Sequence, residues 1–215
     1  MLFRSVYPTP NASQSKSVRP EDIFDAQHNN VLVVGRPGIG KTMLSTKLLR
    51  MWASGNPKMK KRFEMAFLLK FRHLNSETDL NLYELLDRAE TVQRLDDKVW
   101  SYVKENPTKV LLIFDGIDEF SSRSDLAQDD SYYKNTGQAK MPLRCLYRKL
   151  VSGNLLRGST VITTTRPTAV ECVRNLKFKR TVEILGFTSE QIEDYVEKFT
   201  EGDHGAKETD RKSVV

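Results

Sequence analysis

The strongest constraint on the fold of this chain is a glycine-rich segment between an apolar run and a helical pattern. Residues 35–42 read GRPGIGKT and match the pattern G-x-x-x-x-G-K-[ST] at every fixed position. The apolar run at 31–34 predicts a strand directly before it. The apolar spacing after it predicts a helix over 41–53, with one face made of Leu44, Leu48, Met51 and Trp52. This order is typical of a loop that binds phosphate.

Each fixed position of this loop has a chemical reason. Gly35 and Gly40 let the backbone turn and approach a phosphate without a Cβ in the way. The free N–H groups and the positive end of the helix then face the anion. Lys41 can reach the outer phosphates, and the Thr42 hydroxyl can bind Mg²⁺. We therefore expect the whole loop to bind the nucleotide: Gly35, Arg36, Pro37, Gly38, Ile39, Gly40, Lys41, Thr42 and Met43.

A second motif follows a continuous apolar run at 110–114, which is typical of a strand buried on both faces. Asp115 ends this run, and the carboxyl end of a parallel strand is the edge of the sheet where ligands bind. We expect Asp115 to hold Mg²⁺ together with Thr42. Asp118 and Glu119 follow within five residues, and such a cluster of carboxylates favours a bound cation or a distant partner.

A third segment, 160–165, is rich in β-branched residues and predicts another strand. Pro167 cannot extend the ladder, so the strand is expected to stop there. Arg166 then also lies at the carboxyl edge of the sheet, where a guanidinium can sense or stabilise a terminal phosphate. A surface arginine that happens to follow a strand is the alternative interpretation.

Strands and helices alternate along the chain, which predicts a doubly wound, mainly parallel sheet flanked by helices in three α/β/α layers. The expected strands are 31–35, 63–71, 109–115, 159–165 and 180–185. The expected helices are 41–53, a short one around 80–86, 95–103, 142–151, and a short one at 168–174. The basic cluster at 58–62 is interpreted as a solvated turn. The polar stretch 121–140 lacks periodicity and predicts a long, mobile loop.

These motifs, in this order, resemble the NACHT domain of NOD-like receptors, in the STAND class of P-loop NTPases. The matching stretches are GRPGIGKT at 35–42, LLIFDGIDEF at 111–120 and TTTRP at 163–167. The segment 186–199 resembles the junction with the first helical subdomain of that family, and VRPEDIF at 18–24 resembles the lead-in before the loop. The resemblance covers roughly residues 18–200.

The resemblance implies ATP or ADP with Mg²⁺ as the ligands, and the choice of adenine rests on it alone. It implies that Asp118 or Glu119 orients the attacking water and that Arg166 reads the γ-phosphate. Ile23 and Phe24 would lie near the adenine ring.

Four regions follow from this comparison. Residues 1–17 are expected to be a disordered N-terminal tail, 18–186 the NACHT nucleotide-binding domain, 187–200 the start of a truncated helical subdomain, and 201–215 a polar C-terminal tail. The chain is interpreted as a gene fragment or as a stand-alone nucleotide core. A further helix is expected at 188–199. One face of it is a candidate contact surface, made of Ile192, Tyr195, Val196 and Phe199.

Composition limits the cellular compartments and the binding partners that suit this chain. The net charge is +6, from 34 basic and 28 acidic residues, which favours attraction of ATP. No basic stripe interleaved with aromatic residues is present, so specific nucleic-acid recognition is not expected. Cys145 and Cys172 suit a reducing compartment. No apolar run is long enough for a bilayer and no secretory signal is seen, so no membrane contact and a cytoplasmic location are expected.

The function favoured by the motifs is a nucleotide-dependent signalling switch in innate-immune or related signal transduction, with slow or no hydrolysis. Its expected partners are the nucleotide, other NACHT domains through self-association, and an effector that the sequence does not identify. Two alternatives are a turnover enzyme, either an ATPase or a P-loop kinase, and a non-catalytic fragment that binds a partner through the helix at 188–199.

Overall fold

The computed structural model describes residues 2–6, 16–24, 28–76, 79–128, 131–176 and 178–187, together with Ser189, Ile192, Glu193, Val196 and Glu197. The strands are β1 (Leu2–Val6), β2 (Lys16–Val18), β3 (Asn30–Val34), β4 (Met65–Lys70), β5 (Asp79–Leu80), β6 (Val110–Asp115), β7 (Met141–Pro142), β8 (Thr160–Thr165) and β9 (Arg180–Gly186). The α-helices are α1 (Lys41–Ala53), α2 (Pro57–Arg62), α3 (Phe71–Leu74), α4 (Leu82–Asp87), α5 (Asp97–Glu105) and α6 (Leu143–Val151).

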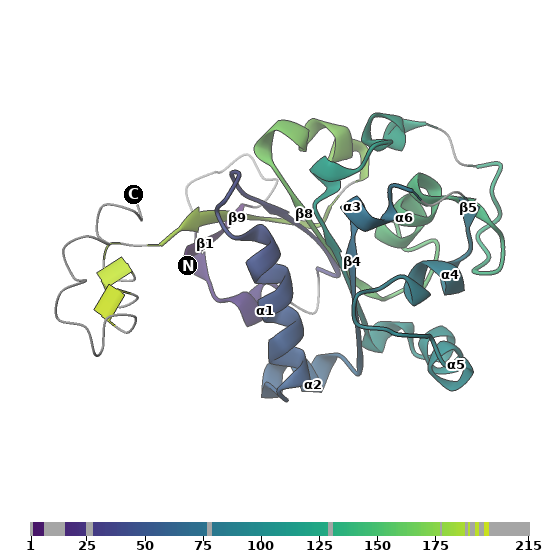
Figure 1. Ribbon diagram of the computed structural model, residues 1–215, viewed down its shortest axis with the longest axis horizontal. Coiled ribbons are helices and arrows are strands. Elements are labelled where there is room, and N and C mark those ends of the chain that lie inside the picture. The colour runs from purple at the N-terminus through teal and green to yellow at the C-terminus, as the bar shows by residue number, and fades with distance from the viewer. Residues whose placement is uncertain are drawn as a thin grey trace.

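The main sheet has seven strands in the order β2-β1-β9-β3-β8-β6-β4. Strands β9, β3, β8, β6 and β4 run parallel, and β1 and β2 add an antiparallel edge. Helices α1 and α2 lie on one side of this sheet, and α3, α4, α5 and α6 lie on the other (Figure 1). The predicted mainly parallel α/β/α sheet is therefore confirmed.

Strand β6 shows why the apolar run at 110–114 is continuous. Leu111 and Ile113 pack into the cluster that α1 covers, whereas Leu112 and Phe114 pack into the cluster on the opposite face. Because both faces of the strand are buried, every position needs an apolar side chain. The continuous apolar run therefore predicted correctly that β6 is a strand buried on both faces.

The N-terminal segment differs from the expected disordered tail. Leu2–Val6 forms β1, which pairs antiparallel with β9, and Lys16–Val18 forms β2, which pairs with β1. The edge of β9 offers unpaired backbone groups to β1, so a short segment without clear periodicity can form a strand there. Residues 7–15 lie outside the described part of the chain.

The basic cluster at 58–62 is a helix rather than a solvated turn. Asn56 caps α2 by accepting hydrogen bonds from the backbone N–H groups of Lys58 and Met59, and Pro57 occupies the first helical position. Met59 is the buried anchor of α2, whereas Lys58 and Lys60 are exposed. Met59 is the one buried residue of α2. Because the residues around it are charged, the sequence showed no apolar pattern from which this helix could be predicted.

The polar stretch at 121–140 contains local structure that its sequence did not predict. A 3₁₀ helix spans Arg123–Ala127, and Leu126 within it is buried. The carbonyl of Gly137 accepts a hydrogen bond from the N–H of Leu82, and Lys149 donates to the side chain of Asn135. The expected helix at 168–174 is two 3₁₀ helices, Pro167–Ala169 and Glu171–Leu176.

The expected helix at 188–199 is described only in part. Ser189, Ile192, Glu193, Val196 and Glu197 are helical. Thr188, Gln191, Tyr195 and Phe199 lie outside the described residues, as does the expected tail at 201–215. Within the described residues, none of the helices combines the length and the apolar character needed to cross a bilayer.

Candidate functional site: the phosphate loop and its carboxylate

The glycine-rich loop joins the carboxyl end of β3 to the start of α1, as the sequence predicted. The N–H of Gly35 donates to the carbonyl of Thr165 at 3.0 Å, so the loop starts from a point fixed on β8. A Cβ at Gly35 would lie 2.7 Å from Cγ2 of Ile39, which excludes any larger residue without a shift of the loop. Gly40 has φ 101° and directly precedes α1, a backbone conformation that favours glycine.

Lys41 folds back over this loop. Its ammonium donates to the carbonyls of Gly35 at 2.9 Å and Arg36 at 3.1 Å. Burial lowers the pKa of Lys41, the negative charge of Asp118 opposes that shift, and the positive charge of Arg166 adds to it. The lysine is thus held at the start of α1, where the helix N-terminus also favours an anion.

Asp115 joins three elements at the carboxyl edge of the sheet. It lies at the end of β6 and is 5% exposed. Its Oδ2 accepts a hydrogen bond from Thr42 at 2.8 Å, and its Oδ1 accepts from Ser45 at 3.0 Å and from Thr164 at 2.7 Å. Helix α1 and strand β8 are therefore both fastened to β6 by one carboxylate.

This arrangement fits a magnesium ion bound with a polyphosphate. Because Thr42 gives its hydroxyl hydrogen to Asp115, the lone pairs of its oxygen are left for a cation. Hydroxyl and carboxylate oxygens are ligands that Mg²⁺ prefers, alongside phosphate oxygens and water. A cavity of about 230 Å³ lies here, with the loop on one side and Asp115 on the other. Magnesium bound there would neutralise phosphate charge.

Arg166 and Asp118 meet at the same cavity. The Nε of Arg166 lies 2.7 Å from Oδ2 of Asp118, and the backbone N–H of Arg166 donates to Oδ1 at 3.1 Å. The side chain of Asp118 is 8% exposed and that of Arg166 is 44% exposed. Asp118 is thus fully engaged by one partner residue.

Glu119 has a different environment from Asp118. Its carboxylate is exposed, lines the cavity, and forms no hydrogen bond or ion pair with the described part of the chain. Its backbone carbonyl accepts a hydrogen bond from Asn75 at 2.8 Å, which fixes the turn that carries it. The two acidic candidates therefore differ in availability, which the sequence could not show.

The structure separates the predicted loop residues into two groups. The cavity is lined by Pro37, Gly38, Gly40, Lys41, Thr42 and Met43, and also by Asp115, Asp118, Glu119 and Arg166. Gly35, Arg36 and Ile39 do not line it. Gly35 is buried beneath the loop, and Ile39 packs against the core on the α1 side.

Two hydroxyl side chains of this site were missed by sequence reasoning. Ser45 and Thr164 hold Asp115, and the Thr164 oxygen also accepts the N–H of Gly116 at 2.8 Å. Ser45 lies three positions after Thr42, so it shares a helical face with it, which was a usable signal. Thr164 could be placed only once β8 was known to neighbour β6.

The comparisons with known proteins agree with this geometry. The family model of the NACHT domain matches residues 29–203. The chain is 36% identical over 197 residues to Protein NLRC5 of Mus musculus, a match that covers 88% of this chain and 10% of the relative. It is 31% identical over 179 residues to Nucleotide-binding oligomerization domain-containing protein 2 of Bos taurus, covering 82% of this chain and 17% of the relative.

A third relative, Protein NLRC5 of Ictalurus punctatus, is 35% identical over 175 residues, covering 79% of this chain and 10% of that protein. The chain thus spans between 10% and 17% of the length of these relatives. The family match covers most of the chain and includes the loop, Asp115 and Arg166. The chain therefore belongs to the NACHT domain family, as a NACHT domain of the NOD-like receptors.

Proposed function

We propose that this NACHT domain binds ATP or ADP with Mg²⁺ and acts as a nucleotide-dependent signalling switch. The observation that carries the proposal is the 2.8 Å hydrogen bond between Thr42 and Asp115, beside the ammonium of Lys41. A hydroxyl, a carboxylate and an ammonium at one cavity supply the groups that a magnesium polyphosphate needs. The name of the Bos taurus relative includes nucleotide binding and oligomerization, which supports the proposal that this domain binds a nucleotide.

Each residue has a role in this proposal. The loop amides and Lys41 bind the outer phosphates, and Thr42 and Asp115 hold the cation. Arg166 reads the terminal phosphate by exchanging its present partner, Asp118, for a phosphate oxygen. The state of the nucleotide would thus decide whether Asp118 keeps its ion pair, which links the ligand to the 3₁₀ turn Ile117–Glu119.

Slow or absent hydrolysis belongs to the same proposal. Asp118 is engaged by Arg166 and largely buried, so Glu119 is the carboxylate available to orient water. If hydrolysis occurs, Glu119→Gln should abolish it, whereas Asp118→Asn should alter nucleotide affinity as well. Phosphate release near typical enzyme rates, about 10 per second, would instead favour a turnover ATPase.

The signalling role is proposed from the family. Self-association with other NACHT domains would transmit the bound state to an effector, in the cytosol and in innate-immune or related signalling.

Calorimetric titration of Mg-ATP and Mg-ADP into the wild type and Lys41→Ala tests the binding step. We expect affinity to fall about tenfold or more in Lys41→Ala, because a charge-assisted contact to phosphate is lost. Lys47→Ala, an exposed lysine on the same helix, is the matched control and should stay within about twofold. Unchanged binding in Lys41→Ala contradicts the proposal. A wild type that binds no nucleotide would leave the interaction-fragment alternative.

A further inference from the structure

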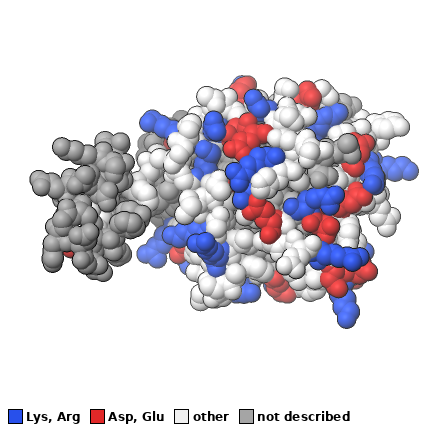
Figure 2. Space-filling view, viewed as in Figure 1, with Lys and Arg blue, Asp and Glu red and all other residues white. Residues whose placement is uncertain are grey.

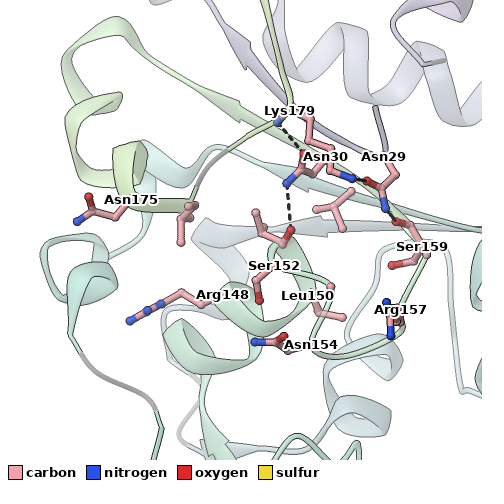
Figure 3. Close-up of a pocket in the computed structure, with 15 residues that line it drawn as sticks. Asn29, Asn30, Arg148, Leu150, Ser152, Asn154, Arg157, Ser159, Asn175 and Lys179 are labelled. Carbon is pink, nitrogen blue, oxygen red and sulfur yellow. Dashed lines mark hydrogen bonds between the residues drawn. The ribbon is translucent and has the colours of Figure 1, made fainter. Parts of the chain in front are cut away.

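A second cavity, of about 510 Å³, lies at the opposite edge of the sheet from the phosphate loop (Figure 3). It opens where three parallel strands begin: Asn30 starts β3, Ser159 precedes β8, and Lys179 precedes β9. The phosphate loop lies at the other end of β3, whose five residues span about 16 Å at roughly 3.3 Å per residue. The two sites therefore lie at opposite ends of β3.

Among the residues that the structure describes, the lining of this cavity is basic and contains neither a carboxylate nor an aromatic ring. Its positive charges come from Arg148, Arg157 and Lys179, and asparagine and serine side chains supply further polar groups. On the face of the molecule that Figure 2 shows, charges of both signs are interspersed. Exposed lysines such as Lys58 and Lys140 have acidic partners within 2.8 Å. The described lining of the cavity therefore lacks the acidic partners that these two lysines have.

The wall of the cavity is a fixed hydrogen-bonded frame. Asn30 is 6% exposed, and its side chain donates to the carbonyl of Val151 at 3.1 Å while accepting the N–H of Lys179 at 2.7 Å. Asn29 donates to the carbonyl of Ser159 at 3.3 Å. These contacts join β3, β8, β9 and the end of α6, so the cavity keeps its shape without a ligand.

Two of the cations form no ion pair with a carboxylate among the residues that the structure describes. The ammonium of Lys179 donates to the neutral amide of Asn29 at 2.8 Å. Arg157 forms no hydrogen bond or ion pair with the part of the chain that the structure describes. Figure 3 shows Lys179, Asn29, Ser159 and Arg157 following one another along one side of the cavity. Both side chains thus bring a positive charge to the same wall.

We propose that this cavity binds a compact soluble anion that carries phosphate groups. Ammonium and guanidinium groups beside amide and hydroxyl donors are the chemistry that recognises a phosphomonoester. The described lining residues include no aromatic ring and so offer no stacking platform of the kind that single-stranded nucleic acid uses. Of the described part of the chain, the large exposed apolar residues are Met43, Tyr132, Leu185 and Phe187, and none of these four lines the cavity as an apolar anchor for a membrane would.

Amide chemical shifts recorded by NMR during titration with inositol trisphosphate test this site. We expect shifts at Gly158, Ser159 and Lys179, with saturation, and a separate set at Gly38 and Gly40 when Mg-ATP is added. Shifts confined to the phosphate loop in the inositol trisphosphate titration overturn the proposal. Because the ATP titration is read in the same samples, failure at one site is distinguished from failure at the other.

Two variants with the same change in net charge separate a specific site from general attraction. Arg157→Glu with Lys179→Glu should weaken inositol trisphosphate binding about tenfold or more and leave Mg-ATP binding unchanged. Lys47→Glu with Arg50→Glu, exposed positions on α1, should change it by less than about twofold. Equal losses in both variants overturn the proposal.

Vesicles distinguish a soluble anion from a lipid headgroup. Vesicles of phosphatidylcholine with a phosphatidylinositol phosphate should sediment the protein no better than phosphatidylcholine alone. Sedimentation that requires the phosphorylated lipid and is lost in Arg157→Glu with Lys179→Glu, without binding of soluble inositol trisphosphate, overturns the assignment.

Discussion

Lys41 carries its charge in surroundings that act on it in opposite directions. Burial lowers its pKa, and the negative charge of Asp118 is the largest influence that opposes the shift. We therefore predict that Asp118→Asn lowers the pKa of Lys41 further. Because only the cation binds phosphate well, nucleotide affinity should fall as pH rises through this pKa, and it should fall at lower pH in the variant. NMR titration of the lysine side chain measures the shift directly.

Asp97→Asn is the control for that titration, since Asp97 is exposed on α5 and absent from the charges that act on Lys41. A pKa of Lys41 that stays constant or rises in Asp118→Asn would show that the carboxylate does not act on the ammonium.

The sequence predicted the positions of residues that have a fixed spacing along the chain. It did not predict which residues meet because their strands are neighbours in the sheet. Lys41, Thr42 and Asp115 were predicted to share one edge, and they line one cavity. The ion pair of Asp118 with Arg166 was not predicted, because it depends on β8 lying beside β6. Spacing along the chain gives local geometry, whereas pairing between strands is decided by the packed molecule.

Strand β8 contributes the hydroxyl of Thr164 to the surroundings of Asp115. Thr164 donates to Asp115 and accepts from the N–H of Gly116, and both of those partners are buried. We predict that Thr164→Val, which preserves shape, lowers the free energy of unfolding by about 1–3 kcal/mol, because two buried polar groups lose a partner. Urea unfolding without nucleotide measures the change.

Thr160→Val on the same strand is the matched control. Thr160 is also buried, at 2% exposure, but its hydroxyl forms no hydrogen bond with any residue that the structure describes. The same replacement there should be neutral or stabilising. Equal destabilisation at both positions would mean that the hydrogen bonds of Thr164 add nothing beyond its packing.

The segment after Asp118 and Glu119 contains the 3₁₀ helix Arg123–Ala127. A substitution in this helix can test whether the segment is folded onto the domain. Leu126 is 1% exposed and belongs to the core cluster that α6 covers. We predict that Leu126→Ala lowers the free energy of unfolding by about 2–5 kcal/mol, since a cavity is left in the core. Tyr132→Ala, at a side chain that is 90% exposed, should change it by less than about 0.5 kcal/mol.

Chemical denaturation of the two variants measures their free energies of unfolding. Similar midpoints for Leu126→Ala and Tyr132→Ala would support the original expectation of a mobile loop. The sequence could not reveal the anchor, because one apolar residue among polar neighbours has no periodicity to mark it.

Over the whole molecule, the sequence predicted the parallel layers but not the lateral order of the strands. Each apolar run marks a buried strand, yet nothing within the run of β3 shows that β8 and β9 are its neighbours. The antiparallel edge was missed for the same reason, since β1 finds its partner at the far end of the chain. Long-range pairing is therefore the part of this fold that local patterns leave open.

Strand β1 connects this missed edge to the glycine-rich loop through β9. It pairs with β9, and β9 supports the phosphate loop: a Cβ at Gly35 would lie 3.4 Å from Cβ of Ile184, and one at Gly186 would lie 3.2 Å from Ile39. Arg4 pairs with both Ser17 of β2 and Glu183 of β9, so its backbone lies inside the ladder. A change that removes the N–H of Arg4 should weaken the support of the loop.

We predict that Arg4→Pro lowers the free energy of unfolding by roughly 1–3 kcal/mol, because proline removes a donor from the interior of the ladder. It should also weaken Mg-ATP binding and promote self-association, since the edge of β9 becomes open to a second chain. Urea unfolding, calorimetry and sedimentation velocity measure the three effects. Arg4→Ala keeps the backbone N–H and should match the wild type in all three. If Arg4→Pro also matches the wild type, β1 does not support the loop, and the site depends on the parallel strands alone.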